Sequence, residues 1–262
     1  MRSSFSLVHP RRALRRLLNE YATGRRSRLL EEIPFASGLG DSVWVLYGLA
    51  RSLKPEVCVE IGSARGKSAC YVGLALEENG KGKLYAIDPH TKTEWNDDNS
   101  VETYEVMRQN LGSLGLLDRV EIVRKTSGQA ALSWNMPIDL IFIDGDHTYE
   151  GVKRDWELFT PHLAPFGVVV FHDTAWEIDR VSRRQNSRED MAVPRFVEEL
   201  RLAGQPVITL PRDFGVSIVQ ARPGGLSLLP PAVEVASSHD GLTWESEQED
   251  ILDFADTRRP PT

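Results

Sequence analysis

The sequence of 262 residues predicts an α/β fold, in which a doubly wound and mostly parallel sheet is covered by helices on both faces. Three observations support this class. Short apolar runs rich in β-branched residues alternate with stretches of helical character, as expected of parallel strands joined by helical crossovers. The first of these runs leads through a glycine turn into a helix. Two later runs are separated only by a short turn, which predicts that the last strand is antiparallel.

The parallel strands are predicted in the centre of the chain, with helices between them. We expect the strands at residues 56–61, 83–88, 120–124, 138–144 and 167–172. The intervening helices are expected at residues 68–79, 100–112, 127–134 and 149–163. A further helix over 194–202 precedes the antiparallel pair, which is predicted at 206–210 and 215–220. Helical structure over residues 35–53 should lead into the first strand.

The composition narrows the class of protein. With 41% hydrophobic and 26% charged residues, the chain resembles soluble globular proteins, and no apolar run reaches the roughly 18 residues that a membrane-spanning helix needs. The net charge of -7 argues against nucleic acid as a partner. The chain has 2 cysteines, too few for a disulfide scaffold, so a reducing environment and a cytoplasmic location are expected.

Charge and proline content divide the chain into three parts. Residues 1–53 are basic and helical, and their arginines are expected to lie on accessory helices that pack on the domain or on a second copy of the chain. Binding of this part to an acidic surface or membrane is the alternative. Residues 54–222 hold the alternating pattern, and residues 223–262 are acidic and proline-punctuated, which predicts a loosely held tail.

A glycine turn after the first strand predicts a ligand-binding loop. Glu60 ends the strand, the chain turns through Gly62 and Gly66, and the next helix begins near Ser68; Ser63 lies within the turn. This arrangement collects backbone N–H groups and a helix N-terminus at the carboxyl edge of the sheet. The spacing differs from the G-x-G-x-x-G pattern of dinucleotide sites. An ordinary turn between strand and helix is the alternative interpretation.

The residues that follow the next two strands could bind the nucleoside part of a ligand held by this loop. Asp88 ends the second strand, where a carboxylate can accept both hydroxyls of a ribose. Its alternative role is to form the turn before Pro89. Ser127 follows the third strand and offers groups for an adenine edge, although capping of the next helix would explain it equally well.

A second cluster of polar residues follows the fourth and fifth strands. It comprises Asp144, His147, His172 and Asp173. The two carboxylates should converge and suit Mg²⁺, Ca²⁺ or Mn²⁺, with His172 as a less favoured ligand than Asp173. His147 is suited to accept a proton near neutral pH. The alternatives are a histidine that only hydrogen-bonds a carboxylate and a histidine that only packs at the end of its strand.

The Glu-x-Gly-x-x-x-Gly loop resembles the cofactor loop of class I S-adenosylmethionine (SAM) methyltransferases. The segments 143–152 and 171–174 are more specific, and they resemble a group that includes macrolide-sugar O-methyltransferases and cephalosporin hydroxylase-like proteins. The resemblance covers residues 56 to about 220. It implies a seven-stranded, Rossmann-like sheet with a reversed last strand, and SAM lying across the first, second and fourth strands.

In the sugar-modifying relatives, Mg²⁺ binds the acceptor hydroxyls and a histidine at the position of His147 acts as the base. The resemblance therefore implies that Asp144 and Asp173 bind the metal, and that Asp144 also lies beside the cofactor. His172 is a departure, because the sugar enzymes tend to have an acid at this position. Segments 91–99 and 176–188 are expected to form the walls of the acceptor site.

The expected function is SAM-dependent O-methylation of a hydroxyl on a sugar, glycan or small natural product, with His147 as general base, Asp144 in support and a divalent metal. Two other interpretations remain open. A metal-dependent hydrolase would use Asp144, His147 and Asp173, but it would not need the glycine turn. A SAM-binding protein without catalysis would need the turn alone.

Overall fold

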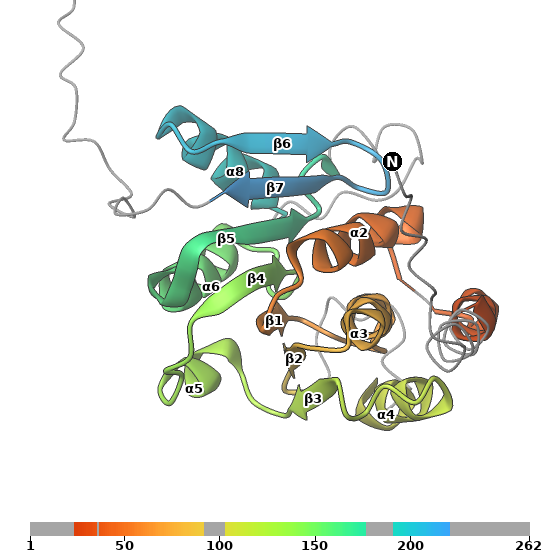
Figure 1. Ribbon diagram of the computed structural model, residues 1–262. Helices are drawn as coiled ribbons and strands as arrows, with labels where there is room; N and C mark the ends of the chain where they lie inside the picture. Colours follow the sequence, from red (N-terminus) through yellow and green to blue (C-terminus); the bar gives the residue numbers. More distant parts are fainter. Residues whose placement is uncertain (1–23, 36, 92–102, 177–190, 221–262) are drawn as a thin grey trace, which may run out of the picture. The chain divides into compact units, whose positions relative to one another are not determined.

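A computed structural model of the chain describes residues 24–35, 37–91, 103–176 and 191–220 (Figure 1). The basic residues before Gly24 and the acidic tail predicted at 223–262 lie outside this part. So do almost all residues of the two predicted acceptor walls. The proposed boundaries of the three parts of the chain therefore stay predictions.

The structure confirms the predicted sheet. Its seven strands lie in the order β3-β2-β1-β4-β5-β7-β6. Their bounds are β1 Val57–Ile61, β2 Lys83–Ile87, β3 Val120–Val123, β4 Ile138–Ile143, β5 Leu163–His172, β6 Val207–Leu210 and β7 Val216–Gln220. Strands β1 to β5 pair in parallel, whereas β7 pairs antiparallel with both β5 and β6. The last strand in the sequence is thus inserted between β5 and the edge strand β6.

Helices cover both faces of the sheet (Figure 1). One face carries α2 (Val43–Leu53), α3 (Lys67–Asn79) and α4 (Thr103–Ser113), and the other carries α5 (Ser127–Ala131), α6 (Tyr149–Phe159) and α8 (Val193–Leu202). Two short 3-10 helices, η1 (Gly40–Ser42) and η2 (Thr160–His162), precede α2 and β5. A helix is also described over residues 24–32.

The alternation of side chains along β4 explains why its sequence is almost continuously apolar. Leu140 and Phe142 enter the core beneath α2 and α3, whereas Ile141 and Ile143 enter the core beneath α6 and α8. A strand buried on both faces needs apolar residues at every position. Glu60, in the neighbouring strand β1, is an acidic residue at such a buried position. We therefore expect its side chain to have hydrogen-bond partners.

Strand β5 differs from its prediction, since it begins at Leu163 and not at residue 167. The register between β4 and β5 shifts between Ile138 and Leu140. A β-bulge of this kind lets a strand continue through residues that look like a break. Here the strand runs through Pro165, Phe166 and Gly167, and Phe166 has a positive φ of 68°.

The core between α6, α8 and the sheet is built on aromatic side chains, which gives a direct stability prediction. Trp156 is fully buried and stacks on Phe171, with ring centroids 5.8 Å apart. Replacing Trp156 with alanine should lower the free energy of unfolding by about 3–5 kcal/mol, because it removes this contact and leaves a cavity. Urea denaturation would measure the loss. The control Leu132→Ala, at a residue that is 90% exposed, should change stability by less than about 0.5 kcal/mol.

Candidate functional site

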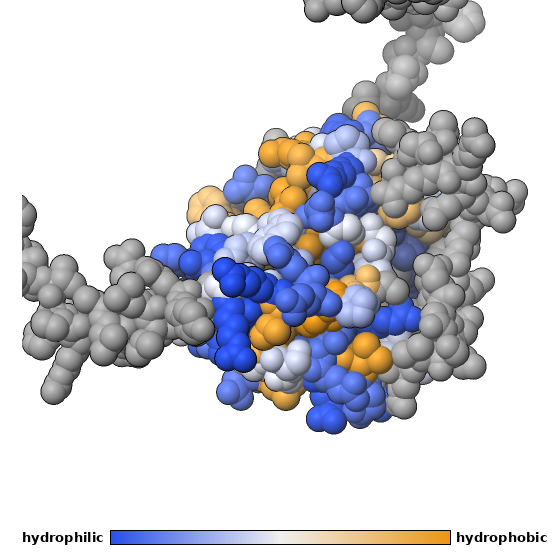
Figure 2. Space-filling view, turned by 90° about the vertical axis from the view of Figure 1, so that its right-hand side faces the viewer, coloured by the Kyte–Doolittle hydropathy of each residue, from blue (hydrophilic) through white to orange (hydrophobic). Residues whose placement is uncertain are grey.

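The carboxyl ends of the parallel strands form one edge of the molecule, and the predicted site residues lie there. In Figure 2, which views the right-hand side of Figure 1, hydrophilic residues lie beside smaller hydrophobic areas. The glycine turn follows β1 at the carboxyl edge of the sheet. Gly62 has a φ of 87° and Gly66 a φ of 81°, and both are positions that favour glycine. A Cβ on Gly62 would lie 2.2 Å from the carbonyl oxygen of Asp144, so the turn packs directly against the end of β4.

Glu60 lies beneath this turn and is 1% exposed. Its carboxylate accepts hydrogen bonds from the hydroxyls of Ser63, at 3.2 Å, and of Ser68. Burial raises the pKa of Glu60 to about 8, although the hydroxyl of Ser68 opposes the shift. These contacts favour a role for Glu60 in ordering the loop over direct binding of an ammonium group by its carboxylate.

Asp88 holds the same loop from the end of β2. Its carboxylate accepts the backbone N–H groups of Ser63 at 2.9 Å, Ala64 at 2.8 Å and His90 at 2.6 Å. An ionised carboxylate has about four acceptor positions, so after these three hydrogen bonds Asp88 keeps capacity for about one more, such as one from a ribose hydroxyl. This residue therefore both shapes the loop and can bind a ligand held within it.

The donor set fits SAM. Helix α3 begins at Lys67 after Gly66, which has no side chain that could cap the first N–H groups of the helix. Uncapped N–H groups at a helix N-terminus bind an anion such as the carboxylate of an amino acid. Asp88 can bind the ribose at the other side of the turn. The loop thus offers complementary groups to both ends of an amino-acid nucleoside.

Ser127 is not needed as a helix cap, because Thr126 performs that role. The hydroxyl of Thr126 accepts the backbone N–H of Gln129, and Gln129 closes a capping box. The side chain of Ser127 lies near the carboxylate of Asp155 on α6, where it opposes the burial that raises the pKa of Asp155 to about 6. Ser127 lies at the carboxyl end of β3, where we predicted the adenine edge, and its binding role stays a prediction.

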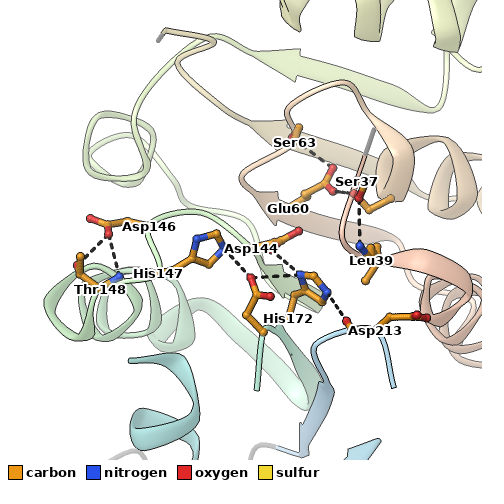
Figure 3. A network of polar contacts seen from close by, with 12 residues as sticks. Ser37, Leu39, Glu60, Ser63, Asp144, Asp146, His147, Thr148, His172 and Asp213 are labelled. Atoms are coloured by element: carbon orange, nitrogen blue, oxygen red, sulfur yellow. Dashed lines mark hydrogen bonds and ion pairs between the residues drawn. The ribbon is translucent and has the colours of Figure 1, made fainter. Parts of the chain in front are cut away.

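The second predicted cluster is assembled at the ends of β4 and β5 (Figure 3). Nε2 of His147 lies 2.9 Å from Oδ2 of Asp173 and 3.5 Å from Oδ1 of Asp144. Nδ1 of His172 lies 3.0 Å from Oδ1 of Asp144 and 3.4 Å from Oδ2 of Asp173. Each carboxylate thus contacts both imidazoles, and the four side chains form one charged network.

His172 is held between two acceptors. Its Nδ1 faces the carboxylate of Asp144, and its Nε2 lies 3.0 Å from the carbonyl oxygen of Asp213. Two acceptors are both satisfied only when both ring nitrogens carry protons, so the geometry favours an imidazolium. Burial opposes the charge, but the carboxylates of Asp144 and Asp173 raise the pKa of His172 well above its usual value.

The pKa of His147 is also raised above its usual value. Burial lowers its pKa, but hydrogen bonds to Asp144 and Asp173 outweigh burial and raise the pKa to about 9. Burial would raise the pKa values of the two carboxyl groups, but the charge of His172 and the hydrogen bonds from the histidines lower both. In the absence of other ligands, the network is therefore two carboxylates neutralised by two imidazolium groups.

The same residues include groups that can bind a metal ion. One ligand atom from each of Asp144, His147 and Asp173 lies within 4.8 Å of the others. Carboxylate oxygens suit a divalent cation such as Mg²⁺, so Asp144 and Asp173 fit the predicted metal. His172, which we predicted as a ligand, lies beside this group with its Nε2 directed at the carbonyl of Asp213. Its role as a ligand stays a prediction, and the contacts favour a hydrogen-bonding role.

The side chain of Asp146 has a structural role at the start of α6. Its Oδ1 accepts two hydrogen bonds from Thr148, one from the backbone N–H at 3.0 Å and one from the side-chain hydroxyl at 2.8 Å. Thr148 in turn caps α6 by accepting the N–H of Gly151. This arrangement fixes the start of α6 and the direction in which His147 leaves the chain.

The turn between β6 and β7 supports the cluster, and the sequence did not reveal it. The carboxylate of Asp213 accepts the N–H and the hydroxyl of Ser42, both at 2.9 Å, while its carbonyl holds His172. Asp213, Phe214 and Gly215 all have positive φ values of 53°, 64° and 91°. Such a strained turn persists only where the surroundings fix it. Its Asp-Phe sequence gave no signal of this conformation.

An aromatic pair lies at the end of β5. Trp176 stacks on Phe214 with ring centroids 4.5 Å apart and an interplanar angle of 24°. A Cβ on Gly38 would lie 3.2 Å from the Phe214 ring and 3.8 Å from the His172 ring. Trp176 is the first residue of the predicted acceptor wall, and Gly38, in the segment before α2, lies close to Phe214 and His172.

Comparison with known proteins agrees with this geometry. Residues 59–174 match a protein family described as a methyltransferase domain. An uncharacterized protein, y4gI of Sinorhizobium fredii, is 30% identical over 143 residues, which is 51% of this chain. The match spans 15% of that relative's own length.

Solved structures share the fold. The O-methyltransferase TomG from Streptomyces achromogenes, in complex with SAM, has a TM-score of 0.55 and 18% identity over 77% of this chain and 89% of its own. Cofactor-bound Rv0187 from MTB has a TM-score of 0.58 and 18% identity over 84% of this chain and 93% of its own.

These findings agree with the predicted class. Residues 59–174 are similar to a methyltransferase domain, and the solved structures that share the fold include O-methyltransferases. The seven-stranded sheet with its antiparallel last strand is the expected framework of such a domain. In the part of the chain that the structure describes, no helix combines the length and apolar character needed to cross a membrane.

The raised pKa of Glu60 predicts how stability depends on pH. The folded protein binds this proton more tightly than the unfolded chain, so its contribution is complete below about pH 4.3 and is lost as pH rises through about 8. Glu60→Gln cannot ionise, so its stability relative to wild type should increase by up to about 1.4 kcal/mol per pH unit in this window.

Urea unfolding of the protein without ligand at pH 5.5 and pH 8.5 would measure the difference. Glu121→Gln provides the matched control, since Glu121 is an exposed carboxylate paired with Lys83. A stability difference between Glu60→Gln and wild type that stays constant over this range would show that Glu60 is ionised throughout.

Proposed function

We propose that the protein is a SAM-dependent O-methyltransferase that acts on a hydroxyl of a sugar, a glycan or a small natural product. The observation that carries this proposal is the contact between two sites. Gly62 of the donor loop packs against the backbone of Asp144, and Asp144 belongs to the network with His147 and Asp173. A methyl donor in the loop would therefore lie beside groups that can bind and deprotonate an acceptor.

On the donor side, each part of the cofactor has a partner. The N–H groups at the start of α3 bind the carboxylate of the amino-acid part, and Asp88 binds the ribose hydroxyls. Ser127 lies by the base, and Asp144 borders the cofactor at the end of β4. Glu60 acts from below by fixing the hydroxyls of Ser63 and Ser68. SAM supplies the activated methyl group.

On the acceptor side, the chain must orient a hydroxyl and take its proton. As the oxygen attacks the methyl carbon, the new C–O bond forms, the S–C bond breaks and the hydroxyl proton passes to Nε2 of His147. His147 must be neutral at this point, whereas its contacts with Asp144 and Asp173 favour the protonated form. A divalent cation such as Mg²⁺, held by Asp144 and Asp173, would offset these negative charges and lower the pKa of the acceptor hydroxyl.

The stacked pair of Trp176 and Phe214 supports a ring-shaped acceptor, because it lies next to this network. Sugars and small natural products present such rings with attached hydroxyls. Three further proposals rest on the sequence alone: assembly of two or more copies through the N-terminal helices, a cytoplasmic location, and a small-molecule or glycan partner without nucleic acid.

Two substitutions test the acceptor side. His147→Ala and Asp173→Ala should lower methyl transfer from methyl-labelled SAM at least about 100-fold, because they remove the base and a carboxylate that orients the acceptor. Transfer would be measured with Mg²⁺ against a panel of sugars and hydroxylated natural products. The affinity for SAM, measured by calorimetry, should change little, because neither residue belongs to the proposed donor site.

His162→Ala is the matched control, because His162 lies in η2, which precedes the opposite end of β5. Full turnover by both site variants would refute the assignments of base and metal ligand. A protein that does not bind SAM would favour the hydrolase interpretation, and binding without transfer to any acceptor would favour a non-catalytic role.

A further inference from the structure

The side chain of a lysine at the start of the donor helix has no role in the site described so far. Lys67 is the first residue of α3, where the helix dipole disfavours a positive charge. Its Nζ donates a hydrogen bond to the carbonyl oxygen of Gly40, 2.7 Å away. Burial lowers the pKa of Lys67, although the carboxylates of Asp213 and Asp41 oppose the shift. The contacts that stabilise this cation thus lie outside the donor loop.

Gly40 belongs to a segment that contacts both α3 and the turn before β7. We call this segment, residues 38–42, the strap. Gly40 has a φ of 51°, and a Cβ on it would lie 2.3 Å from Cγ of Asp213. The backbone N–H and the hydroxyl of Ser42 both donate to the carboxylate of Asp213. The strap is therefore fixed by Lys67 on one side and by Asp213 on the other.

The turn that holds the strap also holds the histidine–aspartate network. The carbonyl oxygen of Asp213 lies 3.0 Å from Nε2 of His172, whose Nδ1 faces Asp144 (Figure 3). The backbone of Asp144 packs against Gly62 of the donor loop, and this loop leads into Lys67. The contacts thus form a closed ring from the donor helix through the strap, the turn and the network back to the donor loop.

This ring joins the donor side to the acceptor side at two points. One is the close approach of Gly62 to Asp144, and the other is the hydrogen bond from Lys67 to the strap. A single point of contact would let the two sides rotate relative to each other, and the second contact removes this freedom. Methyl transfer needs such a fixed geometry, because a small displacement of the reacting groups lowers the rate steeply.

We propose that Lys67 is a positioning residue for methyl transfer, which holds the strap against Asp213 and so fixes the histidine–aspartate network relative to the bound donor. This inference rests on the methyltransferase function proposed above. It adds to that function a side chain that acts on the strap, whereas the backbone N–H of the same residue stays available to the cofactor.

Hydrogen exchange of the whole protein tests this link without any acceptor. The amide of Ser42 donates to the carboxylate of Asp213, and the amide of Gly215 donates to the carbonyl oxygen of Arg212. Mass spectrometry of peptides that contain these amides would measure their exchange with and without S-adenosylhomocysteine. Lys67→Met should speed the exchange of both amides at least about tenfold, because it removes a hydrogen bond from a charged group to the strap.

Two further measurements separate positioning from direct binding. The affinity of Lys67→Met for S-adenosylhomocysteine, measured by calorimetry, should stay within about threefold of the wild type, because the N–H groups that bind the donor remain. With an acceptor that the wild type methylates, kcat should fall at least about tenfold while KM for SAM changes little. Lys67→Arg keeps a cationic donor and should restore most of the slow exchange.

Lys81→Met is the matched control, because Nζ of Lys81 contacts Glu56 at the same distance of 2.7 Å but precedes β2 at the opposite edge of the sheet. It should leave both amides unchanged.

Two results would overturn the inference while the proposed function stands. One is a Lys67→Met protein that loses its affinity for S-adenosylhomocysteine with normal exchange, since Lys67 would then bind the cofactor directly. The other is faster exchange at Ser42 alone, since the strap would then not control the turn. A wild type that does not bind S-adenosylhomocysteine would overturn the proposed function and this inference together.

Discussion

The site depends on the close approach between the turn after β1 and the end of β4. Only glycine fits at position 62, because a Cβ there would collide with the carbonyl oxygen of Asp144, and its φ of 87° suits no other residue well. This contact places the donor loop and the histidine–aspartate network on one edge. Without it, the two sites would be separate features of the sheet, and neither alone would make a methyltransferase.

The second constraint is the concentration of acidic side chains at this edge, which the fold accommodates in three ways. Glu60 is buried with hydroxyl partners, and burial raises its pKa to about 8, so it stays largely uncharged at neutral pH. Asp88 accepts backbone N–H groups from the loop. Asp144 and Asp173 are paired with two imidazoles. Isolated buried carboxylates would be costly, so each acid is stable only because a specific partner lies beside it.

Much of this arrangement could be predicted from the sequence, because the carboxyl ends of parallel strands meet at one edge. The alternation of strands and helices placed Asp88, Asp144 and Asp173 together without any structural information. The role of Asp213 could not be predicted in this way. It acts through a backbone carbonyl in a strained turn, and such a contact leaves no local pattern in the sequence.

The central claim is that the methyl donor and the acceptor-activating network share one edge. A crystal structure of the protein with bound SAM tests this most directly. The account predicts that the ribose hydroxyls lie at Asp88 and that the sulfonium methyl group points toward the space beside Asp144 and His147. A methyl group directed away from this network, or a cofactor bound elsewhere on the domain, would contradict it.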